Sequence, residues 1–277
     1  MIRAITAIFL LSGSTLFSQG TKTSNPPKYY RTPGPRATPG RTAGSDPVVV
    51  NAASFEPGVS PGCLVTIFGS DLTSVSGVVV AQSTPLPLTL ANVSVLVNSV
   101  PSPIYSIAYA NGQDQISFQV PSATSVGPGS AHVEVLDGDT TTADLVVDSF
   151  TEDPGIFAYD SNIAVAVNSV DGSLIGPDNP VSPGDVVVLY TTGLGPVSVS
   201  VADGYPAPSN PLAYTVDPFQ VLLDNEDCQV LFSGLAPGFV GLYQVNFRVP
   251  FDAASGGLNL QIQSPYASSR VVTLPVQ

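Results

Sequence analysis

Few side chains in this 277-residue chain are suited to acid–base or metal chemistry. The only histidine, His132, lies in an alternating stretch (residues 131–135), where it would share the polar face of a strand with Glu134. An imidazole can serve as a general base or as a metal ligand, although an exposed histidine is more often simply solvated. One histidine and two cysteines also supply few nitrogen and sulfur ligands for zinc. We therefore predict no catalytic residue, no metal site and no cofactor.

Acidic residues gather at two turns, Asp137-Gly138-Asp139 and Asp224-Asn225-Glu226-Asp227. Calcium takes about six to eight oxygen ligands, usually from several convergent carboxylates. Neither stretch has the spacing of an EF-hand, so we interpret both as hairpin tips whose charge keeps the protein in solution. A calcium-dependent surface-binding module is kept as an alternative function.

The sequence also lacks the common signatures of nucleophilic and phosphate chemistry. It contains neither a Gly-x-Ser-x-Gly elbow nor a glycine-rich phosphate loop followed by lysine. Two carboxylates distant in sequence can still meet in space, as glycoside hydrolysis requires. A secreted hydrolase acting on polysaccharide or peptide is therefore a second alternative. It predicts a deep acidic cleft between two domains, near residues 153–157.

Cys63 and Cys228 are an even pair, which permits a disulfide if the chain is exported. Such a bond would join two domains, because the cysteines lie in different halves of the chain and at positions that do not match. The alternative is two isolated, partly buried thiols. Spacing alone does not choose between them.

Three aromatic residues are candidates for an interaction surface. Tyr205 and Tyr266 lie in loop-like surroundings, and Phe239 belongs to the glycine-flanked stretch Pro237-Gly238-Phe239-Val240-Gly241. Exposed aromatic rings commonly bind sugars or proteins, but most tyrosines of a β-sandwich are packing residues. Phe239 is either a corner tucked under a sheet or part of an exposed partner patch.

The element that organises the chain occurs twice, at residues 115–121 and 244–250. Ile116, Phe118 and Val120 alternate with Gln115, Ser117 and Gln119, and the second copy repeats the pattern. Strict alternation predicts a strand with one buried and one solvated face, and the closing proline marks its end.

Further stretches recur in the same order, with offsets that drift from 117 to 129 residues. Val50-Asn51 is matched by Val167-Asn168, and Ser60-Pro61-Gly62 by Ser182-Pro183-Gly184. Because each half holds several short alternating stretches and turn signals but no helical pattern, we predict an all-β protein of two tandem immunoglobulin-like β-sandwich domains. The first would span residues 48–153 and the second 154–277.

The residues before these domains have another character. Residues 1–20, with Arg3 before an apolar run, are typical of a signal peptide, and residues 21–47 form a proline-rich basic linker. From Pro47 onward only two basic residues face twenty acidic ones, a formal charge of −18. The charge argues against nucleic acid as a partner, and the signal predicts a secreted or extracytoplasmic protein without a transmembrane segment in its mature form.

Several spaced motifs resemble the Solibacter uncharacterised C-terminal domain family. They are Asn51-Ala52-Ala53-Ser54, Ser60-Pro61-Gly62, Pro154-Gly155-Ile156-Phe157, Thr192-Gly193-Leu194-Gly195, Ser233-Gly234-Leu235-Ala236-Pro237-Gly238 and Tyr243-Gln244-Val245-Asn246. Each half also resembles an IPT/TIG-type domain, through residues such as Phe68-Gly69. The resemblance implies a modular β architecture outside the cytoplasm, and it brings no catalytic residue.

We therefore expect an exported, non-enzymatic protein of the cell envelope or extracellular space. It would act as a structural, adhesive or interaction module. Its partner would be an unknown protein or glycan at the cell surface, with self-association as a variant.

Overall fold

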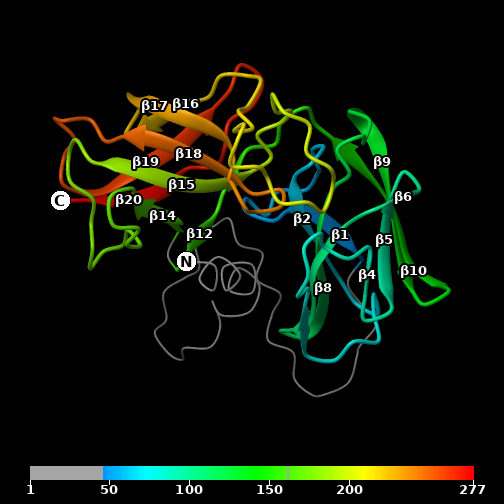
Figure 1. The fold of residues 1–277 in the computed structure, drawn as a ribbon. Coiled ribbons are helices and arrows are strands. Elements are labelled where there is room, and N and C mark those ends of the chain that lie inside the picture. The colour runs from blue at the N-terminus through cyan, green and yellow to red at the C-terminus, as the bar shows by residue number, and fades with distance from the viewer. Residues whose placement is uncertain (1–45, 161) are drawn as a thin grey trace.

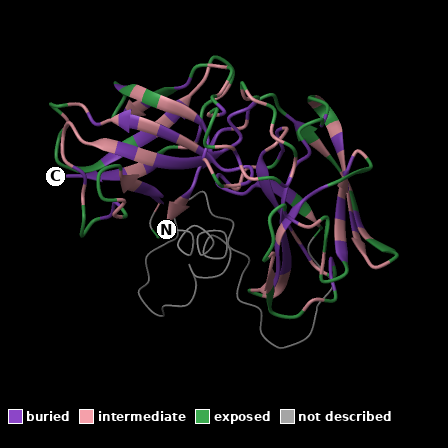
Figure 2. Cartoon of the chain, in the orientation of Figure 1, coloured by how far each residue is buried: buried purple, intermediate pink, exposed green. Residues whose placement is uncertain are grey.

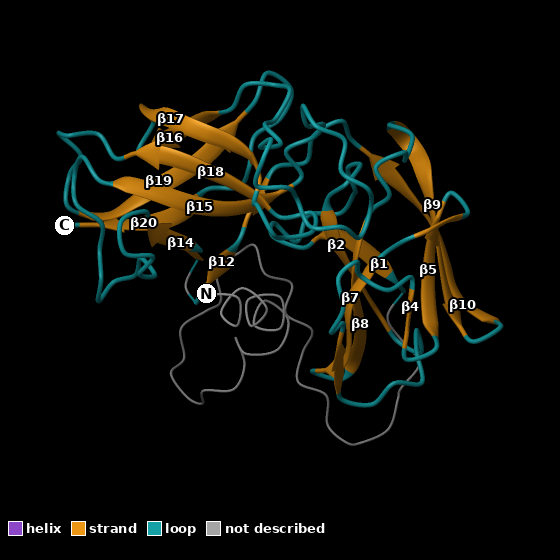
Figure 3. Ribbon diagram, in the orientation of Figure 1, coloured by secondary structure: helices purple, strands orange, loops and turns teal. Residues whose placement is uncertain are grey.

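The computed structural model describes residues 46–160 and 162–277, and all of its regular elements in these ranges are β-strands (Figure 3). For these residues the prediction of an all-β fold is confirmed. The predicted signal peptide and residues 21–45 of the predicted linker lie outside the described residues. Within the described ranges, no helix has the length and apolar character needed to cross a membrane.

The N-terminal half, residues 46–153, contains two five-stranded sheets. The first has the order β1 (Val48–Asn51), β2 (Leu64–Gly69), β8 (Gln113–Gln119), β7 (Ile104–Ala110) and β3 (Val78–Val80). The second has the order β10 (Thr140–Ser149), β9 (Gly127–Asp137), β5 (Val93–Val97) and β4 (Thr89–Leu90), with β6 (Val100–Pro101) also paired to β5. Buried side chains from both sheets, such as Phe118 and Val133, form one core between them.

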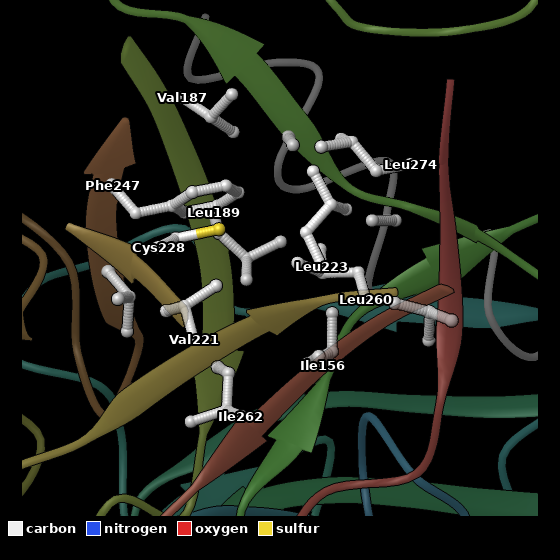
Figure 4. Close-up of a cluster of buried hydrophobic side chains, with 14 of the residues drawn as sticks. Ile156, Val187, Leu189, Val221, Leu223, Cys228, Phe247, Leu260, Ile262 and Leu274 are labelled. Carbon is white, nitrogen blue, oxygen red and sulfur yellow. The ribbon is translucent and has the colours of Figure 1, made fainter. Parts of the chain in front are cut away.

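The C-terminal half, residues 154–277, forms a single ten-stranded sheet. Its order is β11 (Gly155–Ile156), β15 (Val186–Thr192), β18 (Tyr243–Arg248), β17 (Glu226–Leu235), β16 (Gln220–Leu223), β19 (Gly256–Gln263), β20 (Val272–Val276), β13 (Ile163–Ala164) and β12 (Ala158–Tyr159), and β14 (Ala166–Asn168) pairs with β15. The sheet folds around one core that joins Leu189 and Phe247 to Val221 and Leu260, with the sulfur of Cys228 among them (Figure 4).

One strand explains why the second sheet is continuous. The first residues of β17 pair with β16, and the rest pair with β18 beyond an irregularity between Val230 and Phe232. In the N-terminal half the corresponding chain is broken into β6 and β7, around Pro101 and Pro103. A proline has no N–H to donate, so the regular ladder is interrupted there. The chain still crosses between the sheets, because the N–H of Ser102 donates to the carbonyl of Val95 at 2.8 Å and the carbonyl of Pro103 accepts from the N–H of Gln119 at 2.9 Å.

The two halves share their strand pairing at one end. β1 pairs with β2 and β2 with β8, as β14 pairs with β15 and β15 with β18. In this register Asn51 corresponds to Asn168, Leu64 to Val186, and Gln119 to Arg248.

The repeated strand departs from expectation in its first copy. Its apolar face is buried, as predicted, with Ile116 and Phe118 fully enclosed. The face predicted to be solvated is also buried, because Gln115, Ser117 and Gln119 are each less than 9% exposed. β8 is a central strand, and the hydroxyl of Ser117 shares a hydrogen bond of 3.0 Å with that of Thr66 on β2. In β18 the polar positions stay half-exposed, as the alternation predicts.

Candidate functional site

A third apolar cluster lies where the two halves meet. It joins Ala53 and Leu64 of the N-terminal half to Phe157, Tyr190 and Leu242 of the C-terminal half. In Figure 2 the buried residues, coloured purple, continue through this region between the two sets of strands. Since burial of one such side chain contributes about 1.5–3 kcal/mol, the cluster stabilises one arrangement of the halves.

Backbone and side-chain hydrogen bonds cross the same junction. The N–H of Asp153 donates to the carbonyl of Gly193 at 2.9 Å. On the N-terminal side of the junction, the amide of Asn51 donates to the carbonyl oxygen of Asp153 at 2.7 Å and to its carboxylate at 3.1 Å. The backbone N–H of Leu64 donates to the Thr192 hydroxyl at 2.9 Å, and the Tyr105 hydroxyl donates to the carbonyl of Val240 at 2.7 Å. These buried polar groups have fixed partners, which adds geometric specificity to the apolar contact.

The periphery of the junction is closed by charged and polar pairs. Arg270 forms an ion pair with Glu56. The backbone N–H of Gly204 donates to the Gln119 side chain at 2.7 Å, and the backbone N–H of Ser122 donates to the carboxylate of Asp203 at 3.1 Å.

Glycine permits the close approach of the backbones. Gly193 has φ +77°, and a Cβ placed on it would lie 2.0 Å from the carbonyl oxygen of Asp153. Gly241 has φ +60°, and its Cβ would lie 2.9 Å from the Leu64 side chain. Any larger residue would have to separate the halves or distort the turn.

The acids at the junction are held by protein groups. Burial raises the pKa of the Asp153 carboxyl, a shift opposed by the hydrogen bond from Asn51. Burial also raises the pKa of Glu152; the hydrogen bond from Ser264 opposes this shift, and the nearby carboxylate of Asp217 adds to it. The hydrolase alternative requires an acidic cleft here; the side chains of the apolar cluster occupy the region of Phe157 instead.

The turn that begins β2 and the turn that begins β15 are built alike. The N–H of Gly62 donates to the carbonyl of Val120 at 3.0 Å, and that of Gly184 donates to Val249 at 2.9 Å. The Ser60 N–H donates to the sulfur of Cys63 at 3.2 Å, where the Ser182 N–H donates to the carboxylate of Asp185 at 3.1 Å.

The neighbouring strand ends repeat two more contacts. The Gln119 side chain donates to the carbonyl of Gly62 at 3.3 Å, as Arg248 does to Gly184 at 2.6 Å. The Asn51 side chain accepts from the N–H of Ala53 at 2.9 Å, as that of Asn168 does from Val170. Both halves therefore carry the same end structure.

We call residues 51–54, 60–64 and 119–122 the junction end, and residues 168–171, 182–186 and 248–251 the free end. The junction end is covered by the C-terminal half, so Ala53 is 7% exposed. At the free end the corresponding Val170 is 90% exposed. Phe251, which corresponds to Ser122, is 79% exposed and lies over Gly184. The C-terminus lies at the same end of the molecule, on the left of Figure 1. The free end is the candidate functional site.

Two of the aromatic candidates from the sequence, Tyr205 and Phe239, lie on neighbouring loops, since the N–H of Ala207 donates to the carbonyl of Phe239 at 2.8 Å. Tyr205 is 52% exposed beside the junction, and Tyr266 is 72% exposed in the loop after β19. Phe239 is partly buried against the junction cluster, in agreement with the tucked-corner interpretation. Val170 and Phe251 were missed, because nothing in the sequence says which of two matching turns is covered.

The disulfide that the cysteines permit is not formed. Cys63 and Cys228 are both free and buried, each in the core of its own half. Burial raises the pKa of Cys63 to about 12 and that of Cys228 to about 11. Each thiol is thus protonated and enclosed at neutral pH, which makes it a poor nucleophile.

His132 lies on the outer face of β9, as the alternation predicts, and Glu134 shares that face. The structure adds Asp144 from β10, whose carboxylate pairs with the His132 imidazole. The ligand atoms of these three residues lie within 4.8 Å of one another, so they are the group among the described residues that could hold a metal ion.

Comparison with known proteins gives little. No family model matches the chain, and no curated protein matches it. Among solved structures, an endo-fucoidan hydrolase from glycoside hydrolase family 107 is 11% identical with a TM-score of 0.19, covering 92% of this chain and 31% of that chain. A variant of that enzyme is 10% identical with a TM-score of 0.16, covering 92% and 30%. The chain thus spans under a third of these enzymes, and TM-scores this low carry no argument about fold or activity.

Proposed function

We propose that this protein is an exported, non-enzymatic interaction module of two immunoglobulin-like β-sandwich domains. The free end would be its docking surface. The observation that supports the proposal is the duplicated end: the same turn and strand ends bind a β domain in one half and stand open in the other. The resemblance to the Solibacter uncharacterised C-terminal domain family and to IPT/TIG-type modules agrees with this role.

The partner we propose is the end of a β-sandwich domain on another protein chain. The junction shows how such an end binds a β domain. Apolar side chains pack together there, and hydrogen bonds such as that from the Leu64 N–H to the Thr192 hydroxyl accompany them. The free end offers the same turn geometry with larger apolar side chains, Val170 and Phe251, where the junction end has Ala53 and Ser122. Large exposed apolar side chains at a loop cluster are typical of a protein interaction site.

The charge of the chain disfavours a second copy as that partner. From Pro47 onward the chain carries two basic residues against twenty acidic ones. Two molecules of such charge repel each other at low ionic strength, so a different protein is the better occupant.

A photo-crosslinking amino acid placed at Val170, in cells that export the protein, tests the proposal. The matched control places it at Val216, which is 60% exposed and outside the free end. We expect a protein adduct at position 170 that is absent at 216, with its crosslinked peptide in an end loop of a β-sandwich domain. The adduct should disappear in the Phe251→Ser variant, which carries at position 251 the residue that the junction end has at the equivalent position, Ser122.

Three results would overturn the proposal. Equal adducts at positions 170 and 216 would remove the free end from the interaction. An adduct with carbohydrate alone would make the module a glycan binder, and a self-adduct would replace the proposed partner by a second copy. The hydrolase and calcium alternatives gain no support from the contacts described above.

A further inference from the structure

We propose that His132, Glu134 and Asp144 form a binding site for one divalent transition-metal ion of the zinc class. The site lies on the outer face of the second sheet of the N-terminal half. It is independent of the free end, which is in the other half.

Strand geometry brings the three side chains together. His132 and Glu134 are two residues apart on β9, so they project from the same face. Asp144 on β10 stands directly opposite Glu134, and His132 is its diagonal neighbour. Antiparallel pairing holds these strands in one register, so the site is built on rigid backbone rather than on loops.

The donor set suits a zinc-class ion. It offers one imidazole nitrogen and two carboxylates, whose ligand atoms lie within 4.8 Å of one another. Zinc binds such atoms at about 2.0–2.2 Å and often takes three protein ligands with water in an open position. Calcium and magnesium prefer all-oxygen sets, so a nitrogen donor with only two carboxylates selects against them. All three side chains reach solvent, which leaves room for the water ligand.

Neither β9 nor β10 carries a lysine or an arginine beside the two carboxylates. Glu134 and Asp144 form a directly opposed cross-strand pair, an arrangement that like charges disfavour. The His132 ring contacts Asp144, and the residue opposite Glu134 on the other side is Leu96, which carries no charge. A bound divalent ion would neutralise both carboxylates at once.

The second copy of the fold shows that these charges are not needed to build the sheet. β5 pairs with β9 as β16 pairs with β19, so His132 corresponds to Asn259 and Glu134 to Gln261. The C-terminal half thus carries neutral amides at these positions. The difference gives variants that the fold already accepts, His132→Asn and Glu134→Gln.

The test uses untagged full-length protein and zinc chloride. Because His132 is the only histidine, the protein gives one set of imidazole proton resonances in NMR. We expect these resonances to shift on titration and to saturate at one zinc per chain. Calorimetry should give the same stoichiometry, and calcium chloride should move neither signal.

The variants decide which side chains hold the ion. His132→Asn and Glu134→Gln should each weaken zinc binding at least about tenfold, since removal of mere supporting partners costs about 10–100-fold in metal sites. Asp139→Asn, on the same hairpin but outside the trio, should bind as the wild type does. No shift of the histidine resonances at millimolar zinc, or unchanged affinity in both variants, would overturn the site.

Discussion

The junction end and the free end are two copies of one structure with opposite surroundings. Each has a Ser-Pro-Gly turn, an asparagine that accepts from the backbone, and a long polar side chain that donates to the turn glycine. One copy is buried by the other half of the chain, and the other stands in solvent. The local sequence thus builds the end, and what lies against the end decides its role. Matched substitutions at equivalent positions therefore measure what the contact contributes.

The largest effect is expected for Gly193→Ala. The new Cβ would meet a backbone carbonyl at 2.0 Å in a left-handed conformation, so the junction must open. We expect a loss of about 4 kcal/mol or more in the free energy of unfolding, measured by urea denaturation. Gly238→Ala is the control, because Gly238 has φ +83° with no atom within 4 Å of a Cβ. Its cost should be only about 1 kcal/mol; equal costs would mean that close packing at Gly193 is unimportant.

Leu64→Ala should cause the second-largest loss in the free energy of unfolding. Leu64 is 1% exposed in the junction cluster, and truncating a buried leucine costs about 2–5 kcal/mol through lost burial and a residual cavity. Val186→Ala, at the equivalent half-exposed position of the free end, should cost less than about 1 kcal/mol. Urea midpoints of both variants measure the difference. If the two costs were equal, the junction would add nothing to the stability of its end.

Asn51→Ala should cost about 2–4 kcal/mol, because it removes a buried donor and leaves the Asp153 carbonyl and carboxylate without that partner. The equivalent Asn168→Ala loses a turn contact and a 3.4 Å contact with Asp185, at about 1 kcal/mol. Calorimetric unfolding of the two variants tests the order, and a larger loss for Asn168 would contradict it.

The two regions should also differ in the sign of their pH dependence. Burial raises the pKa of Glu152 in the folded protein above its unfolded value of about 4. Its contribution to the free energy of unfolding is therefore fully present below pH about 4 and is lost as the pH rises through the folded pKa. Asp171 at the free end has the opposite sign: hydrogen bonds from Ser173 lower its pKa, so its contribution is lost as pH falls.

Glu152→Gln should therefore reduce the decline of stability above pH about 4, and Asp171→Asn should reduce the loss below it. Urea midpoints measured across about pH 3–7 check both predictions. The change of the midpoint with pH in each variant is compared with that of the wild type. Unchanged slopes in Glu152→Gln would show that the junction carboxyl does not titrate with folding.

The smallest effect is expected for thiol chemistry. Cys63 at the junction end and Cys228 in the other core are enclosed and protonated, so a thiol reagent should label neither in native protein. Both should label after unfolding in denaturant, and a reducing agent should leave the melting temperature unchanged. A disulfide-dependent rise in stability would contradict two free thiols.

Much of the molecule follows from its sequence. Alternation at residues 115–121 and 244–250 determined two core strands, and the recurring turns determined that the same end is built twice. Pro101 and Pro103 lack an N–H, which interrupts the regular ladder between β6 and β7. These are local properties, because side-chain period, turn geometry and a missing N–H act within a few residues.

Only the tertiary structure decided which copy is covered. Asn51 and Asn168 read alike in sequence, yet one is buried against Asp153 and the other lies at an open end. Tertiary pairing also buried the polar face of β8, separated the two cysteines into different cores, and placed Asp144 beside His132 and Glu134. Contacts between residues far apart in the chain depend on packing of whole sheets, which no local pattern encodes.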